Sequence, residues 1–509
     1  MRNPDVVVVG AGAGGAVLAA RLSEDPGCEV LLLEAGPVPR HGFAHKALDA
    51  RLVPGAQPGH PYVRPVPVRL TPDRRYTAPR GRVLGGSTTV NGGYFVRARR
   101  ADFARWARAC GDPRWSYERV LPSLRALETD LDHPDDPGHG TTGPVPVLRT
   151  SLAHPAAAAF VAAAGELGHP PEPDKNAQDP PGIGPVPTNT LGGLRVNAGL
   201  AFLPGALDRP NLTVRGGSTV RSVVIARGRA TGVVVETDGR RTVVAAGETV
   251  LCAGALATPH LLQLSGVGPG ARLARLGIPV AADLPAVGAA LSDHPQVALA
   301  WRPRRPLADP VGTWLGGALH LTSFAGEPGV GDLEILQSLL PMAALTGGTT
   351  TAGQAPQVLL VSVQTPRRRG GLRTVSADPD VPPCVDLGYL GTPADLGGLR
   401  EAVRAAADVV GTGAFAEVCA GLSDPGAGVL DDDRALDGWI RARLGTAQHT
   451  CGTVPMGPSG AVDAHGRVHG IAGLRVADTS ILPDAPSRGP AATAVLIGEL
   501  AAGSLRRGA

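Results

Sequence analysis

The chain has 509 residues, and 48 basic against 45 acidic residues give a formal net charge of +3. Hydrophobic residues make up 43% and charged residues 18%, which excludes wholesale disorder. The charge balance argues against nucleic acid as a partner. At roughly 100–200 residues per domain, the length predicts two or three domains.

Six cysteines lie far apart without a CxxC pair, which favours a thiol-containing cytosolic protein over a disulfide scaffold. The first predicted strand begins at about Asp5, so we expect no signal peptide. No run of about 18 apolar residues is present, which predicts no spanning helix. The last predicted helix allows peripheral contact with a membrane surface, although packing against the core is its default role. We expect a cytoplasmic protein.

The first predicted elements form a βαβ unit. Val6–Val9 is a β-branched run, typical of a strand buried in a parallel sheet. A helix pattern follows from about Gly14 to Ser23, and a second strand is expected at Glu29–Glu34. The order of strand, turn, helix and strand is that of a βαβ unit.

A glycine motif lies at the turn of this unit. Gly10, Gly12 and Gly15 form GxGxxG. Gly10 permits the tight turn, Gly12 lets a pyrophosphate approach the backbone, and Gly15 allows close helix–strand packing. Glu34, at the end of the second strand, is placed to accept a hydrogen bond from a ribose hydroxyl. The pattern predicts a dinucleotide site, with Gly14 included, but does not distinguish FAD from NAD.

The remaining elements are predicted in chain order. Pro37–Pro79 is expected to be an extended, non-helical excursion. The later expected elements are helices at Val120–Leu131 and Ala156–Leu167, antiparallel strands at Leu212–Arg215, Val220–Ala226, Thr231–Glu236 and Arg240–Ala245, a strand at Thr249–Cys252, and helices at Asp437–Leu444 and about Ala491–Arg506.

Two further segments are GRVLGGSTTVNGGYFVRA (81–98) and GALATPHLLQLSGVG (254–268). They resemble the first and second signatures of the glucose–methanol–choline (GMC) flavoprotein oxidoreductases. Shorter family-like stretches follow in the family's order: RPNLTV (209–214), DLPAVGAALSDH (283–294), HTCGTVPMG (449–457) and RVHGIAGLRVADTSILP (467–483). The resemblance extends from residue 6 to about residue 505.

This resemblance implies an FAD site. It implies that Gly85, Gly86, Ser87, Thr88 and Asn91 hold the pyrophosphate and isoalloxazine. It further implies that the Val220 backbone meets the adenine, that Asp478 lies near the ribityl–pyrophosphate, and that the last helix, starting at Ala491, directs its N-terminus at the flavin. For the second signature a purely architectural role stays open. Gly81–Arg100 contains no His or Cys, so we expect the FAD to be bound without a covalent link.

His449 is the expected catalytic residue, because it aligns with the active-site histidine of the family. Alcohol oxidation needs a hydride acceptor and a group for the hydroxyl proton, and an imidazole with a pKa near ~6.5 suits the second task. The family places a second His or Asn about 40 residues later, and this position is Gly489 here. Asp293 and His294 lack a third ligand at zinc-site spacing, so no metal site is expected.

The resemblance implies the α/β architecture of the GMC family, with a discontinuous Rossmann-type FAD-binding domain and a mixed-sheet substrate domain. We assign residues 1–111, 191–299 and 441–509 to the first and residues 112–190 and 300–440 to the second.

The expected function is FAD-dependent oxidation of an alcohol to a carbonyl. Val90–Asp132 further resembles the dehydrogenases linked to the redox peptide cofactor mycofactocin, which implies a modified-peptide substrate and electron transfer toward the respiratory chain. One alternative is a primary-alcohol or choline-type oxidase that uses oxygen, and another is a lyase with a structural flavin. A nicotinamide enzyme is the weakest option. The electron acceptor is left open, and a small-molecule alcohol remains the other substrate class.

Overall fold

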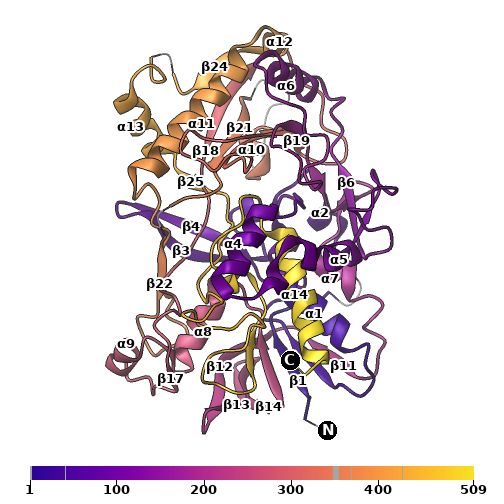
Figure 1. The fold of residues 1–509 in the computed structure, drawn as a ribbon, viewed down its shortest axis with the longest axis vertical. Helices are drawn as coiled ribbons and strands as arrows, with labels where there is room; N and C mark the ends of the chain where they lie inside the picture. The colour runs from indigo at the N-terminus through magenta and orange to yellow at the C-terminus, as the bar shows by residue number, and fades with distance from the viewer. Residues whose placement is uncertain (1–2, 40–41, 348–354, 368, 427, 509) are drawn as a thin grey trace.

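The computed structural model describes residues 3–39, 42–347, 355–367, 369–426 and 428–508. The chain builds a lower half around a parallel sheet and an upper half around an antiparallel sheet, and both ends of the chain lie in the lower half (Figure 1). Each half has its own large hydrophobic core, and a smaller cluster packs beside the antiparallel sheet. Within the described ranges, no helix has both the length and the apolarity needed to cross a membrane.

The lower half contains the predicted βαβ unit at the centre of a five-stranded sheet. Every strand pairing in this sheet is parallel. In spatial order the strands are β11 (Leu212–Arg215), β2 (Val30–Leu33), β1 (Val6–Val9), β15 (Glu248–Leu251) and β26 (Leu474–Val476). Two helices, α1 (Ala13–Leu22) and α14 (Ala491–Arg506), pack against each other beside it (Figure 1). The βαβ unit is therefore completed by strands distant in sequence.

One predicted pairing in this region is wrong. Leu212–Arg215 was expected to belong with the antiparallel strands that follow it, but it pairs parallel with β2 at the edge of the first sheet. The other three strands form an antiparallel sheet as predicted: β12 (Ser218–Ala226), β13 (Arg229–Thr237) and β14 (Arg240–Ala245). A short strand with one buried face gives the same alternation in either orientation, so its pattern could not settle the pairing.

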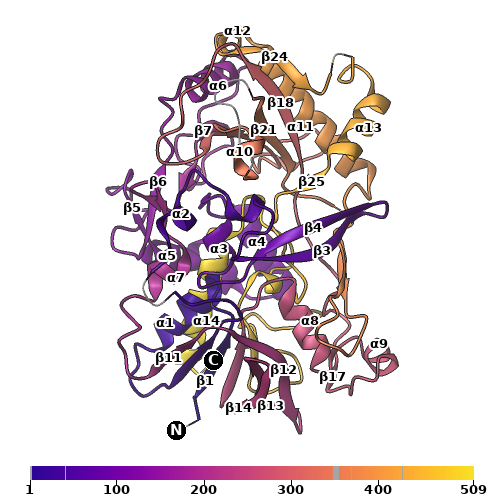
Figure 2. The ribbon, with the colours of Figure 1, turned by 180° about the vertical axis from the view of Figure 1, so that it is seen from behind.

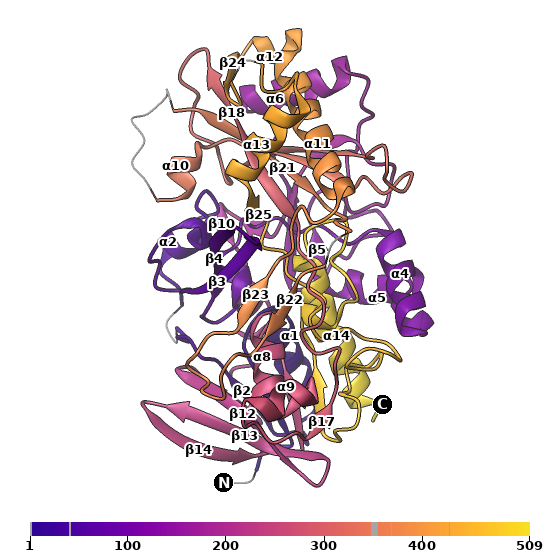
Figure 3. The same cartoon turned by 90° about the vertical axis from the view of Figure 1, so that its left-hand side faces the viewer.

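The upper half is built on an antiparallel sheet, with helix α11 (Pro393–Gly411) packed against β18, β20 and β21 (Figures 1 and 3). In spatial order its strands are β24 (Cys419–Asp424), β18 (Pro295–Pro303), β21 (Gln357–Val363), β20 (Leu333–Ser338), β19 (Leu315–Leu321) and β7 (Ile183–Pro185), with β25 (Gly445–Thr446) also pairing with β18. The strands β20 and β21 are buried along their whole length, as expected for strands in the middle of a covered sheet.

A β-hairpin between the halves replaces part of the extended excursion expected at Pro37–Pro79. Strands β3 (Val63–Thr71) and β4 (Arg74–Gly81) pair antiparallel (Figure 2). Strands β23 (Cys384–Asp386) and β22 (Gly371–Arg373) extend their sheet (Figure 3). The prediction of a non-helical path holds for most of this stretch, but the hairpin was missed. The prolines of β3 obscured it, because proline is tolerated only where a strand has a free edge.

The remaining elements are short or connect the two halves. The helices are α2 (His45–Leu48), α3 (Ser87–Val90), α4 (Arg100–Cys110), α5 (Tyr117–Leu127), α6 (Pro155–Glu166), α7 (Ala198–Phe202), α8 (Ala257–Leu264), α9 (Gly270–Arg275), α10 (Met342–Leu345), α12 (Gly413–Ala416) and α13 (Asp433–Arg443). The strands are β5 (Glu128–Asp130), β6 (Val145–Arg149), β8 (Pro187–Thr188), β9 (Thr190–Leu191), β10 (Leu194–Arg195), β16 (Val267–Gly268) and β17 (Ala282–Asp283). The expected helix at Val120–Leu131 thus begins three residues earlier and ends where β5 begins.

Candidate active site

The turn between β1 and α1 presents bare backbone. Gly10 has a φ of +100°, and a Cβ there would lie 2.6 Å from the Cys252 carbonyl oxygen, so the position requires glycine. Gly12 precedes α1, and no side chain among the described residues caps this helix by a hydrogen bond. A Cβ at Gly12 would meet no described atom closer than 3.9 Å. The first turn of α1 therefore offers N–H groups next to open space, which suits an anionic ligand.

Gly14 and Gly15 allow helix α1 to pack closely against neighbouring backbone. A Cβ on Gly14 would lie 2.3 Å from the Ala477 carbonyl oxygen, and a Cβ on Gly15 would lie 1.9 Å from the Gly10 carbonyl oxygen. Gly15 thus has the packing role that the motif predicts. Gly14 belongs to the same close approach of α1 to its neighbours, so only its backbone could face a cofactor.

Glu34 lies at the end of β2 and faces this turn. Its carboxylate accepts hydrogen bonds from the Ala11 N–H at 2.9 Å and from the Gly36 N–H at 2.8 Å. Burial raises the pKa of this carboxyl, and the backbone hydrogen bonds oppose that rise. Each carboxylate oxygen can accept a second hydrogen bond, so these contacts remain compatible with the predicted ribose partner.

The first signature folds against the glycine turn. Gly85 and Gly86 both have positive φ, and a Cβ on Gly86 would lie 2.8 Å from the Gly12 Cα. The Thr88 hydroxyl donates to the Gly85 carbonyl and accepts from the Ala198 N–H, which ties the segment to α7. Two glycine-rich segments that are distant in sequence therefore share one surface.

Polar side chains hold the ends of this segment. The Ser87 hydroxyl oxygen accepts from the Gly81 N–H at 3.1 Å, and the Asn91 side-chain oxygen accepts from the Gly93 N–H at 3.0 Å. The Asn91 side-chain oxygen thus bonds nearby backbone, and its predicted contact with the flavin stays a prediction.

The other predicted cofactor residues lie around the same sheet. The Asp478 carboxylate follows β26 and accepts from the Gly254 N–H and the Thr258 hydroxyl, which joins it to the second signature. Val220 lies in β12 at a register shift between Val220 and Ser222, where a bulge leaves backbone groups outside the ladder. Ala491 begins α14, which has no side-chain cap among the described residues. Together with the Gly12 space, these features fit an extended dinucleotide.

His449 follows β25 on a short loop. Its backbone N–H donates to the Asp293 carboxylate at 2.6 Å, and the preceding Gln448 has a φ of +68°. A Cβ on Gly489 would lie 3.5 Å from His449 Nε2 and 3.6 Å from its Cε1. The structure thus places Gly489 beside the imidazole, at the position where the family pattern leads one to expect a second side chain.

Electrostatic effects on His449 oppose one another. Burial lowers the pKa of this imidazole, the Asp293 and Glu334 carboxylates raise it, and Arg80 lowers it. Because the net shift is downward, the ring is neutral at neutral pH and can accept a proton.

A second imidazole, that of His294, contacts His449, and the residue pattern does not predict this pair. His294 Nδ1 lies 2.8 Å from His449 Nδ1, and the two rings stand at 84° with their centroids 5.0 Å apart. From the sequence, His294 was weighed only as a metal ligand and rejected. The two residues are 155 positions apart, so no local spacing could have indicated the contact.

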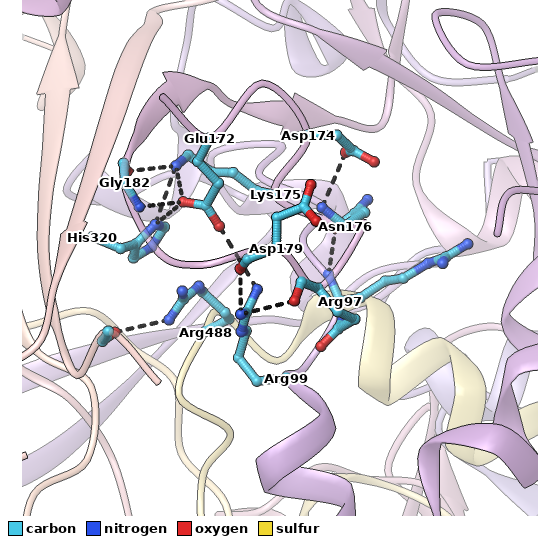
Figure 4. Close-up of polar contacts among 12 residues, drawn as sticks. Arg97, Arg99, Glu172, Asp174, Lys175, Asn176, Asp179, Gly182, His320 and Arg488 are labelled. Carbon is cyan, nitrogen blue, oxygen red and sulfur yellow. Dashed lines mark hydrogen bonds and ion pairs between the residues drawn. The ribbon is translucent and has the colours of Figure 1, made fainter. Parts of the chain in front are cut away.

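A buried polar cluster joins Glu172, Lys175 and His320 (Figure 4). His320 Nε2 lies 3.1 Å from Glu334 Oε2, and His320 Nδ1 lies 3.2 Å from Lys175 Nζ. Lys175 also bonds Glu172 at 2.8 Å. Burial lowers the pKa of Lys175 to about 8, against the opposing effect of Glu172. Lys175 is one of two lysines among 48 basic residues, and this rarity was the available sequence signal.

Glu128, Asp130 and His139 form a second buried cluster with ligand atoms close enough to share a metal ion. Arginines already neutralise it, since Arg97 Nη2 lies 2.5 Å from Glu128 and Arg149 pairs with Asp130. Burial opposes the protonation of His139, but hydrogen bonds to Asp130, Asp174 and Glu128 raise its pKa to about 11. A cationic imidazole between carboxylates is an ion-pair network, so we assign no metal to it.

Comparison with known proteins identifies the same family that the motifs resemble. The N-terminal profile of the GMC oxidoreductases matches residues 5–296, and the C-terminal profile matches residues 366–498. An uncharacterised GMC-type oxidoreductase from Rhodococcus erythropolis is 39% identical, over 98% of both chains. An oxygen-dependent choline dehydrogenase from Rhizobium johnstonii is 34% identical, over 98% of this chain and 94% of that protein.

Solved structures agree with this result. The fold is similar to pyridoxine 4-oxidase from Mesorbium loti, with a TM-score of 0.92 and 29% identity over 99% of both chains. It is also similar to a fungal aryl-alcohol oxidase, with a TM-score of 0.86 and 25% identity over 100% of both chains. The likeness to Aspergillus oryzae formate oxidase, at a TM-score of 0.90 and 24% identity over 100% of this chain and 99% of that chain, supports the fold alone.

Proposed function

The chain belongs to the GMC oxidoreductase family and is an oxidoreductase acting on CH–OH groups, and we propose that it uses FAD to oxidise an alcohol to a carbonyl with His449 as the acid/base group. The observation that carries this proposal is the position of His449 beside a residue without a side chain, Gly489. Its Nε2 faces Gly489, next to the uncapped N-terminus of α14. A substrate hydroxyl therefore has access to a neutral imidazole nitrogen.

When bound, FAD supplies the acceptor for the hydride that leaves the carbinol carbon. His449 takes the hydroxyl proton at Nε2, so the O–H bond breaks as the C=O bond forms. The Asp293 carboxylate holds the His449 backbone through this step. The residues proposed to hold FAD are Gly10, Gly12, Gly14, Gly15, Glu34, Gly85, Gly86, Ser87, Thr88, Asn91, Val220, Asp478 and Ala491.

We propose that FAD is bound without a covalent link. Tyr94 is the one phenol in Gly81–Arg100, and burial raises the pKa of its hydroxyl well above its ordinary value. A buried, protonated phenol is a poor nucleophile. Acid precipitation should release all yellow colour into the supernatant, and colour retained on the pellet would contradict this proposal.

The finer proposal is a dehydrogenase that oxidises a bulky alcohol, such as reduced mycofactocin, and passes electrons toward the respiratory chain. The resemblance of Val90–Asp132 and the absence of a side chain at Gly489 support it. The alternative is an oxidase, which the names of an oxygen-dependent choline dehydrogenase and two oxidases among the relatives favour.

One experiment separates these functions. The purified protein is mixed anaerobically with a panel of alcohols while its visible spectrum is recorded. Bleaching of the flavin supports alcohol oxidation, whereas substrate turnover without bleaching would indicate a lyase with a structural flavin. Oxygen consumption against dye reduction with the same alcohol then distinguishes an oxidase from a dehydrogenase.

A further inference from the structure

The contact between His294 and His449 fixes where protons can lie. A neutral imidazole has one N–H and one lone pair. With the two Nδ1 atoms 2.8 Å apart, one must donate and the other must accept. Which ring donates decides whether His449 Nε2, the nitrogen that faces Gly489, carries a proton or a lone pair.

The role proposed for His449 requires His294 Nδ1 to accept. His294 is fully buried, and burial, together with His449, lowers its pKa well below the ordinary value, so this ring is neutral and can accept at one nitrogen. A base needs its Nε2 lone pair free, so His449 must carry its proton on Nδ1, at 2.8 Å from His294 Nδ1. The single N–H of His294 then lies on Nε2, which has no hydrogen-bond partner among the described residues.

The backbone holds the two rings in register. Ser292 and Cys451 exchange backbone hydrogen bonds of 2.8 and 2.9 Å. Between them, the Asp293 carboxylate accepts from the N–H groups of both His294 and His449, at 2.8 and 2.6 Å. The imidazole pair is therefore carried by two cross-linked segments rather than by flexible side chains.

We propose that His294 is a positioning residue that accepts a hydrogen bond from His449 Nδ1–H and so keeps the His449 Nε2 lone pair directed at the reaction space. The same acceptor serves both protonation states of His449, because the imidazolium retains its Nδ1–H. Proton uptake at Nε2 then requires no change in the contact with His294. This role rests on the proposed function of His449 and adds a residue to it.

The test compares His294→Asn with His294→Leu. The Asn Oδ1 atom stands near the position of Nδ1 and can accept, whereas leucine offers similar bulk without an acceptor. His260→Leu is the matched control, because it removes a buried imidazole that bonds Thr374 instead of His449. The readouts are the anaerobic rate of flavin reduction and the imidazole ¹⁵N shifts of histidine-labelled protein, with His449 identified by its absence in His449→Ala.

We expect wild type and His294→Asn to show His449 protonated at Nδ1. His294→Leu should lose this preference and reduce its flavin at least about 10-fold more slowly, though less slowly than after complete loss of the base. Neutral His449 protonated at Nε2 in the wild type, or a wild-type rate in His294→Leu, would overturn the proposal. If His294→Leu fails to retain FAD, the wild-type and His294→Asn spectra decide. If no alcohol bleaches the wild-type flavin, the proposed function fails while the tautomer measurement still tests His294.

Discussion

The turn around Gly12 presents backbone to its ligand, whereas the region around His449 presents side chains. The first region depends on atoms that are missing, since a Cβ at Gly10, Gly14 or Gly15 would lie within 2.6 Å of a carbonyl oxygen. The second depends on a chain of partners that includes Asp293 and His294. The comparison teaches that added bulk should damage the first region and lost hydrogen-bonding groups the second.

The largest effect is expected from Gly12→Val, which adds bulk to the first region. A β-branched side chain would fill the space beside the first turn of α1, so we expect loss of FAD retention. The bound cofactor stabilises the native state by mass action, so the melting temperature should fall with it. The measurement is the flavin content of the purified protein.

Gly12→Ala is the matched control for size. Its Cβ would meet no described atom within 3.9 Å, so this variant should keep part of its flavin. A fully flavinated Gly12→Val protein would show that the turn is not the phosphate site.

The corresponding test of the second region is His449→Ala, which removes the imidazole. It should leave FAD binding and the visible spectrum nearly intact while slowing flavin reduction by about 10²–10⁴-fold, the usual contribution of a positioned acid–base group. Stopped-flow reduction under anaerobic conditions measures the rate. A variant that reduces its flavin as fast as the wild type would remove His449 from the mechanism.

A smaller effect is expected from the charge of Glu334. The base must be neutral, and the pKa of His449 is lowered, so flavin reduction should be constant through neutral pH and decline only below the ordinary value of 6.5. Glu334 raises this pKa. Glu334→Gln should therefore lower the pKa of His449 and shift the acidic decline of the reduction rate to lower pH, while the maximal rate stays nearly constant. The decline is measured from single-turnover rates of flavin reduction against pH. An unchanged pH dependence in Glu334→Gln would show that Glu334 does not affect the pKa of His449.

The two regions also differ in how far the sequence predicts them. The glycine turn is local, because its strands, glycines and helix all lie within Val6–Leu33. The positive φ and the close packing in this turn require glycine, so the residue types themselves predict it. The parallel placement of Leu212–Arg215 was missed, since short strands carry no signal for their partner. His449 was found by family resemblance, but its pairing with His294 arises from a contact across 155 residues, which composition and periodicity cannot show.

The smallest effect is expected from a substitution at Gly489, which lies beside His449 and one residue before Pro490. A Cβ there would lie 3.5 Å from His449 Nε2, which is ordinary contact distance, so Gly489→Asn should be accommodated. The new amide would occupy space beside the imidazole and offer a second hydrogen-bonding group to a substrate oxygen. We expect native protein to turn over methanol, choline or glucose poorly, and Gly489→Asn to lower kcat/KM for a bulky alcohol while it improves activity on small ones.

Gly489→Ala serves as the control, because it adds bulk without the amide. Efficient native oxidation of a small alcohol, or a Gly489→Asn variant indifferent to substrate size, would contradict an open pocket beside Gly489 and make His294, 2.8 Å from His449, the next residue to test as the second group.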